Sequence, residues 1–306
     1  MDGPHDVARF SNPVNVEVAS DGRVYVADFD NDAIRVISTT GVVSTLVRPA
    51  DVLPLTFSRP FGLTIAPDGF LYVQTDGNDV GARDATTGTV WRVDLGTGMA
   101  TVVARNLGRP RGLQALANGM IAMSDLAHHV VTILNPATGV ETLLAGANDT
   151  PGFVNAAGPA ARFSRPYGLA LLPDGSLLVA DQDNDRLRQV TLAGVVTTFA
   201  GTGVAGTQNG PVATASFNAP QDVAIAGADT YVADHDNFLI RRINAGNVTT
   251  QAGNGMQDFA DGEGSAASFF GMEGIALNAS GSILWIADGN NGNGDPFNRV
   301  RRLNVP

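Results

Sequence analysis

One phrase recurs six times along this chain, and the repetition constrains its fold more than any other feature. A typical copy has an aromatic residue, a proline, a small hydrophobic run, a strand ending in Asp, then Asn and an Arg-bearing strand. The copies span Phe10–Arg35, Phe57–Arg92, Leu107–Val131, Phe163–Arg188, Phe217–Arg241 and Phe269–Arg301. The Asp that closes the second strand recurs about every 50 residues, the period of propeller blades, at Asp28, Asp76, Asp125, Asp181, Asp234 and Asp288. Six such units predict a single domain over residues 1–306.

Composition excludes several classes of protein. No apolar stretch approaches the ~20 residues of a membrane helix, so we expect a soluble protein with no membrane partner. The start, Met1–Gly3, is neither basic nor apolar and predicts no secretory leader, although a leader that had been removed would leave the same sequence. The compartment therefore stays open.

Two missing residue types restrict the chemistry. The chain has no Cys, and all 19 basic side chains are Arg. Thiol nucleophiles, disulfides, thiolate metal sites and lysine Schiff bases are therefore excluded. A net charge of −11 repels nucleic acid, so no nucleic-acid partner is expected.

The fourth copy shows how one unit folds. Tyr167–Leu172 and Ser176–Ala180 predict two strands joined by an Asp-Gly hairpin turn. Arg186–Thr191 and Val195–Ala200 predict the third and fourth strands. Such a four-stranded sheet cannot bury both of its faces alone, so six sheets must pack around a common axis. The predicted fold is an all-β, six-bladed propeller of four-stranded antiparallel blades.

The chain resembles the NHL-repeat family of six-bladed β-propellers. The resemblance rests on Ala-Gly-x-Gly before the loops between blades, Asp-Gly or Asn-Gly within them, Ala-x-Phe-x-x-Pro, Val-Ala-Asp and Asn-x-x-Ile/Leu-Arg. Examples are Ala200–Gly203, Ala252–Gly255, Asp261-Gly262 and Asn209-Gly210. It spans nearly the whole chain and implies the fold, because propellers host many unrelated activities.

The two ends of the repeat array are uneven. Met1–Pro4 aligns with Asp261–Gly264, within a loop between blades, and Arg299–Val305 supplies a third strand after which no outer strand follows. We expect the sixth blade to lack its outer strand within this chain. Either the natural chain is longer, or the blade has three strands, with Arg301 and Arg302 discouraging strand addition at its edge.

Candidate ligand-binding residues lie at the mouth of the predicted channel. The position after the repeated proline, or after its substitute, forms a chemically uneven ring: Val14, Phe61, Arg111, Tyr167, Gln221 and Glu273. Asn15 and Asp222 stand beside it where other copies carry Gly. Arg111 could hold a carboxylate or phosphate, Glu273 could act as acid or base, and Tyr167 could assist by hydrogen bonding. The alternative is a solvated rim of variable residues.

Three further arginines, Arg59, Arg109 and Arg165, precede the proline of three successive copies. With Arg111 they would form a positive arc that attracts anions, or they would pair with a neighbouring blade's Asp as scaffold. The six repeated Asp residues are expected to be structural and to accept backbone N–H bonds of the following turn.

The sequence predicts no required cofactor. His128, His129 and His235 lie in connections of different copies and cannot form a three-histidine site, and no ring position is His, as related amidating lyases would imply. Calcium is the one metal ion that these residues leave open. It could bind the Gly/Asn-rich loop Gly289–Phe297 or, by resemblance to gluconolactonase-type propellers, Asn15, Glu17, Asp222 and Glu273.

Two functions remain open. The first is a propeller that binds a small molecule, glycan or peptide at the mouth of its channel. The alternative is a lyase or hydrolase acting on a small, partly anionic substrate at the same mouth, as strictosidine-synthase-like and lactonase-like propellers make plausible by resemblance. An RNA-binding role, known in some NHL proteins, would need a basic face, for which the Arg arc is the sole support.

Overall fold

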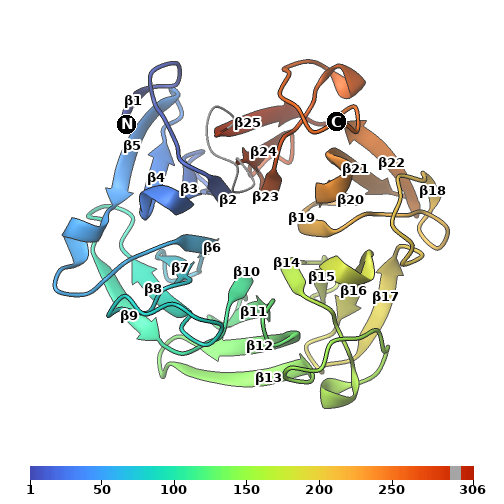
Figure 1. Cartoon of the computed structure of the whole chain (residues 1–306), viewed down its shortest axis with the longest axis horizontal. Coiled ribbons are helices and arrows are strands. Elements are labelled where there is room, and N and C mark those ends of the chain that lie inside the picture. The colour runs from blue at the N-terminus through green and yellow to red at the C-terminus, as the bar shows by residue number, and fades with distance from the viewer. Residues whose placement is uncertain (290–297) are drawn as a thin grey trace.

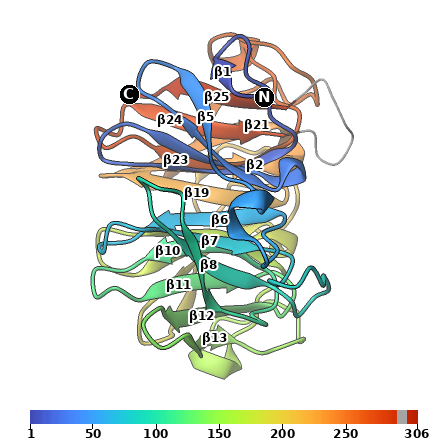
Figure 2. The ribbon, with the colours of Figure 1, turned by 90° about the vertical axis from the view of Figure 1, so that its left-hand side faces the viewer.

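The sheets of the protein form a closed ring around a central channel. A computed structural model describes residues 1–289 and 298–306. Figure 1 shows the six sheets arranged radially, and Figure 2 shows their strands running across the thickness of the disc. The predicted six-bladed β-propeller is confirmed. No helix among the described residues is long and apolar enough to cross a membrane.

Each blade is an antiparallel meander that runs outward from the channel. The innermost strands are β2 (Pro13–Val18), β6 (Pro60–Ile65), β10 (Pro110–Ala115), β14 (Pro166–Leu171), β19 (Pro220–Ala226) and β23 (Met272–Leu277). The second strands are β3 (Val24–Asp28), β7 (Leu71–Thr75), β11 (Ile121–Asp125), β15 (Leu177–Asp181), β20 (Asp229–Asp234) and β24 (Ile283–Asp288). The third strands are β4 (Ala33–Ile37), β8 (Thr89–Val93), β12 (Val130–Asn135), β16 (Arg186–Val190), β21 (Leu239–Asn244) and β25 (Arg299–Asn304).

Five blades have an outer strand: β5 (Val42–Val47), β9 (Ala100–Ala104), β13 (Val140–Gly146), β17 (Val196–Ala200) and β22 (Asn247–Ala252). Two-residue strands that the sequence did not predict extend two of these sheets. β1 (Gly3–Pro4) pairs with β5, and β18 (Gly210–Pro211) pairs with β22. Short 3-10 turns lie in the connections: η1 (Phe29–Asn31), η2 (Pro49–Val52), η3 (Gly158–Ala160), η4 (Gln182–Asn184), η5 (His235–Asn237) and η6 (Gly264–Ala266).

The sixth sheet holds β23, β24 and β25 within the described residues, which confirms the predicted absence of an outer strand. The expectation that Arg301 guards the exposed edge is wrong. Its guanidinium is largely buried and bonds Asp288, whereas Arg302 is exposed. Neighbouring residues of a strand point to opposite faces, so only one of the two arginines can turn toward solvent.

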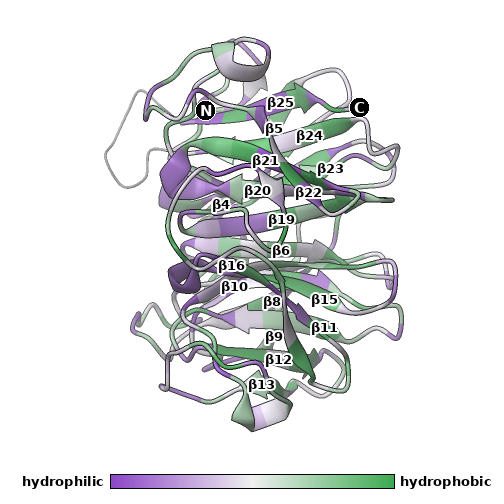
Figure 3. Cartoon of the chain, turned by 90° about the vertical axis from the view of Figure 1, so that its right-hand side faces the viewer, coloured by the Kyte–Doolittle hydropathy of each residue, from purple (hydrophilic) through white to green (hydrophobic). Residues whose placement is uncertain are grey.

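The hydrophobic core lies in the seams between neighbouring blades. One cluster joins Ala122 and Val131 of the third blade to Leu177 and Val179 of the fourth, with Phe163 between them. The aromatic residue that opens most copies of the repeat is buried in this way, as at Phe57, Phe163, Phe217 and Phe269. Figure 3 shows hydrophobic residues concentrated in the strands and hydrophilic residues along the face that carries the 3-10 turns. Each blade is therefore stabilised by its neighbours.

The innermost strands approach one another closely at the channel. A Cβ added at Gly168 would lie 2.0 Å from Asp222 Oδ1 and 2.7 Å from the Gln221 carbonyl oxygen. Similar contacts with the next blade occur at Gly62, Gly112 and Gly274. These positions require Gly because a side chain has no space there.

A buried arginine ties four blades to the segment that leads into them, an arrangement called here the arginine latch. In the fifth blade Arg241 donates to Asp234 at 2.6 Å, to Asn209 at 2.8 Å and to the Ser216 carbonyl at 3.0 Å. Arg35, Arg188 and Arg301 make the same three kinds of contact in the first, fourth and sixth blades.

The repeated Asp residues are therefore structural in these four blades, but their bonds differ from the prediction. One carboxylate oxygen of each Asp accepts an N–H from the segment that precedes the innermost strand. In the fourth blade, Ser164 N–H donates to Asp181 at 2.7 Å. The other oxygen accepts the latch arginine, whose guanidinium also lies 4.8 to 5.5 Å from the centre of the phenylalanine ring that opens the copy. In each of these blades, one Asp and one Arg thus join the second and third strands to the incoming segment.

The second blade departs from the predicted register. Thr75, not Asp76, pairs with Pro60 and closes the second strand, and Trp91, not Arg92, faces Val73. The indole Nε1–H donates to Thr75 Oγ1 at 2.9 Å, and its ring lies 5.4 Å from Phe57. A neutral Thr–Trp pair therefore replaces Asp and Arg within the blade, and Asp76 instead bonds Arg109 and Arg111 of the next blade.

The third blade also lacks the latch. Thr132 stands at the latch position, opposite Met123. Asp125 retains the backbone bonds, accepting from Arg109 N at 3.1 Å, and its other oxygen contacts His128 Nδ1 at 2.5 Å. The imidazole replaces the Asn that donates to the same carboxylate oxygen in the first, fourth and fifth blades.

Candidate functional site

The ring predicted at the channel mouth is assembled in the structure. Its six residues, Val14, Phe61, Arg111, Tyr167, Gln221 and Glu273, are called here the strand ring. Each is the second residue of an innermost strand and is at most 8% exposed. The side chains are therefore packed together, and a rim of freely solvated residues is not what these positions form.

A second ring overlies the first and was missed from the sequence. It consists of the residue that follows each second strand and is called here the loop ring: Phe29, Asp76, Leu126, Gln182, His235 and Gly289. Its members show the same chemical variety as the strand ring. That variety, at one repeated position, is the signal that could have revealed it.

The two rings meet across the seams between blades. The loop-ring residue of one blade contacts the strand-ring residue of the next: Phe29 lies 5.9 Å from Phe61, ring to ring. Asp76 likewise bonds Arg111. Gln182 and Gln221 hold the equivalent positions of the next polar pair in the repeat, and His235 lies close enough to Glu273 to oppose the rise in its pKa. One half of the mouth is thus apolar or ion-paired, and the other half is polar.

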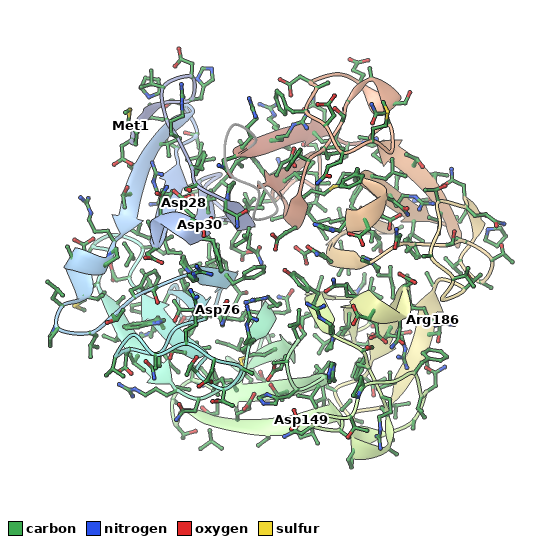
Figure 4. All side chains as sticks on the ribbon, in the orientation of Figure 1. Met1, Asp28, Asp30, Asp76, Asp149 and Arg186 are labelled. Carbon is green, nitrogen blue, oxygen red and sulfur yellow. The ribbon has the colours of Figure 1, made fainter. Side chains whose placement is uncertain are left out.

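Arg111 is engaged by the protein itself. Its guanidinium donates to both oxygens of Asp76, at 2.5 and 3.1 Å, and stacks 4.1 Å from the centre of Phe61. Burial alone would raise the pKa of Asp76, but Arg111 and Arg109 outweigh it and hold that pKa below its usual value. Figure 4 places Asp76 on the channel side of its blade. An anion would have to displace this carboxylate to reach Arg111.

Tyr167 and Glu273 come together in the polar half. The phenol hydroxyl donates to Glu273 Oε2 at 2.7 Å across the channel mouth. Burial raises the pKa of Glu273, with His235, Tyr167 and Arg111 opposing the shift, and burial also raises that of Tyr167. The three residues predicted to act together thus lie within one electrostatic group, joined by His235, which sequence reasoning had not included.

Three polar side chains of this half have unsatisfied atoms. Gln182 Oε1, Gln221 Oε1 and His235 Nε2 are buried and find no hydrogen-bond partner within the described part of the chain. Buried polar atoms normally have partners, so an unpaired set in one place calls for an explanation such as a ligand or water.

The predicted arc of arginines is neutralised locally. Arg109 donates to Asp76 at 2.8 Å. Burial raises the pKa of Asp30 and of Asp183, and Arg59 and Arg165 respectively oppose these shifts from nearby. Each arginine therefore has an acidic neighbour, as the scaffold alternative expects, and in two of the three cases that neighbour belongs to the preceding blade.

Below the rings, a cavity of about 240 Å³ occupies the channel toward the opposite face. Its polar lining includes Asn15, Glu17, Thr64, Gln114 and Asp222. Several of these bridge neighbouring blades by accepting backbone N–H bonds, Glu17 from Ile65 at 3.0 Å and Asp222 from Ile275 at 2.8 Å. Burial raises the pKa of each of these two carboxyls to about 7.

The metal-site alternatives find limited support. The described residues contain no group of three or more His, Asp or Glu side chains placed to hold a metal ion. Asn15 Oδ1 accepts the N–H of Val16, and both Asp222 oxygens accept backbone N–H groups. Of the other candidate loop, residues 290–297 lie outside the described part of the chain.

No family model matches the sequence. The chain is 36% identical over 124 residues to NHL repeat-containing protein 2 of Homo sapiens. This match covers 36% of this chain and 17% of that protein. The chain is also 34% identical over 86 residues to the chloroplastic protein SUPPRESSOR OF QUENCHING 1 of Arabidopsis thaliana, and this match covers 28% of this chain and 8% of that protein. The chain is an NHL-repeat β-propeller. It matches less than a fifth of the length of each of these relatives.

Solved structures share the shape of this NHL-repeat propeller. An auxiliary nutrient binding protein from Bacteroides thetaiotaomicron superposes with a TM-score of 0.74 at 17% identity, over 99% of this chain and 72% of that one. Virginiamycin B lyase from Staphylococcus aureus gives a TM-score of 0.59 at 16% identity, over 100% of this chain and 87% of the lyase. At such identities the likeness concerns the fold, which serves both binding and catalysis.

Proposed function

We propose that this propeller binds a small polyhydroxylated molecule, such as a glycan unit, at the polar half of its channel mouth. The observation that carries the proposal is the set of buried, unpartnered atoms of Gln182, Gln221 and His235. A ligand that donates hydrogen bonds would satisfy them and remove the cost of leaving them unpaired. Sugar hydroxyl groups donate hydrogen bonds, so a sugar suits these three acceptors.

The chemistry of the polar half favours a neutral ligand. His235 Nδ1 faces the Asp236 carboxylate at 2.7 Å, so in the neutral imidazole Nε2 is left as an acceptor. Arg111, the cation expected to bind an anion, is already neutralised by Asp76. Tyr167 adds an aromatic ring, and binding sites commonly combine such apolar surface with a few polar groups. The nutrient-binding neighbour of similar shape agrees with this proposal.

Titration calorimetry with a panel of neutral mono- and disaccharides tests the proposal. We expect at least one to bind, and Gln221→Ala to raise Kd about tenfold, or about 1.4 kcal/mol. Tyr231→Phe is the matched control for Tyr167→Phe, because the Tyr231 hydroxyl is also buried but, unlike that of Tyr167, has no hydrogen-bond partner among the described residues and is influenced by Asp229 at the other end of its strand. The absence of any binding, or an affinity indifferent to both mouth variants, contradicts the proposal.

The pairing of Tyr167 with Glu273 beside His235 favours one second candidate, a lyase or hydrolase at the same mouth. Burial keeps Glu273 protonated to a higher pH than an ordinary carboxyl, so it could donate a proton to a leaving group. If a lactone, ester or lyase substrate is turned over, Glu273→Gln should lower kcat by about 100-fold or more. The exposed Glu263→Gln is the control, and equal rates in the two variants would remove Glu273 from the mechanism.

A further inference from the structure

The arginine latch that ties four blades to their incoming segments has no counterpart in the third blade. Where it is present, the guanidinium binds the Asp that closes the second strand. It also binds a carbonyl four residues before the innermost strand: Arg9, Arg162, Ser216 or Ser268. In the third blade the latch position holds Thr132, whose short side chain does not carry a cation.

The space that the arginine would fill is a cavity of about 210 Å³. Its polar lining comprises Asn106, Asp125, His128, Thr132, Glu141 and Asn148. Asp125 is the residue that would receive the guanidinium. Asn106 stands four residues before β10, at the position whose carbonyl accepts the latch elsewhere. At about 30 Å³ per water molecule, the cavity has room for a planar group and its stem.

The cavity has acidic groups without an arginine partner. Asp125 and Glu141 form no ion pair with arginine among the described residues. Burial raises the pKa of Glu141, whose carboxylate accepts from Thr132 Oγ1 at 2.7 Å. His128 supplies positive charge, because Asp125 raises its pKa against the effect of burial, and Asp149 contributes a further negative charge. Figure 4 places Asp149 toward the rim of the ring, away from the channel.

We propose that this cavity binds a guanidinium group from outside the chain, that of free arginine or of an arginine residue in a peptide. The ligand takes the place of the missing latch arginine. Its planar donors face Asp125 Oδ2, the Glu141 carboxylate and the Asn106 carbonyl, which are acceptors only. A guanidinium suits this set better than an ammonium because its donors are fixed in one plane and bind carboxylates side by side.

The test uses L-arginine, N-acetyl-arginine amide and a short arginine-containing peptide, with the lysine analogues as reference, in titration calorimetry on the whole protein. We expect the arginine compounds to bind at least tenfold more tightly than their lysine analogues. Binding of all three arginine compounds identifies the side chain as the ligand. Binding of the amide and peptide alone identifies a peptide source, and binding of L-arginine alone identifies the free amino acid.

Two variants make the test specific. Thr132→Arg supplies the guanidinium from within, so it should abolish binding and raise Tm, whereas Thr142→Arg on the exposed face of β13 should do neither. Glu141→Gln should weaken binding about tenfold without filling the cavity, and this readout stands even if Thr132→Arg fails to fold. Arginine binding that is absent, no tighter than lysine binding, or unchanged in Glu141→Gln overturns the proposal.

Discussion

Arg241→Met should destabilise the protein by about 3 to 5 kcal/mol, the cost of removing one partner from a buried ion pair. The Arg241 and Asp234 side chains are both fully buried and their charged atoms are 2.6 Å apart. Burial raises the pKa of Asp234 to about 6 even with the arginine present. Without it, Asp234, the Asn209 side chain and three backbone carbonyls of the incoming segment lose a donor. Urea unfolding followed by circular dichroism measures the loss.

The neighbouring arginine provides a matched control. Arg242 on the same strand pairs with Asp229 in a more exposed position, so Arg242→Met should cost at most about 1 kcal/mol. The double variant Arg241→Met, Asp234→Asn should recover part of the loss, because no charge is then left buried. Equal losses at Arg241 and Arg242 would show that the latch does not stabilise the fold.

Glu17→Gln should stabilise the protein by about 3 kcal/mol at pH 8 and leave its stability unchanged near pH 4. Burial in the channel raises the pKa of Glu17 to about 7 from the ordinary 4.5, and each pKa unit is worth about 1.4 kcal/mol. The folded state thus favours the protonated acid. Its stabilising contribution is present below pH 4.5 and is lost as pH rises toward 7 and beyond.

Glutamine imitates the protonated acid and cannot ionise. Its side-chain oxygen can also accept the hydrogen bond that the Ile65 N–H donates to Glu17 in the wild type. The gain should therefore appear only in the pH range where Glu17 is charged. Thermal unfolding at a series of pH values measures it, with the exposed Glu263→Gln as control. A difference between wild type and Glu17→Gln that does not grow with pH would exclude the channel carboxyl as its source.

The architecture was predictable because six copies of one pattern specify six similar blades. The prediction failed in the second copy, where the residue types and the register of strand pairing disagree. In the second copy Asp76 and Arg92 resemble the repeated Asp and Arg, yet backbone pairing places Thr75 and Trp91 at the equivalent positions. A different pair of residues fills the same space there, and residue identity alone could not reveal the shift of one position.

The candidate site was predicted in part. The strand ring follows from the repeat, because each of its members has the same place in a strand. The residues that contact the strand ring do not follow from the repeat. Asp76 and His235 belong to connections, and they contact Arg111 and Glu273 only because neighbouring blades are offset around the channel. That offset is a property of the assembled ring, so the neutralised Arg111 could not be foreseen from sequence.

The uneven distribution of latches divides the disc mechanically. Blades four, five, six and one follow one another with a latch in each, whereas blades two and three are adjacent and have none. The first group should behave as a stiff arc and the second as a compliant one. Thermal fluctuations of the disc should then be largest in blades two and three. The Arg111–Asp76 ion pair joins these two blades at the channel.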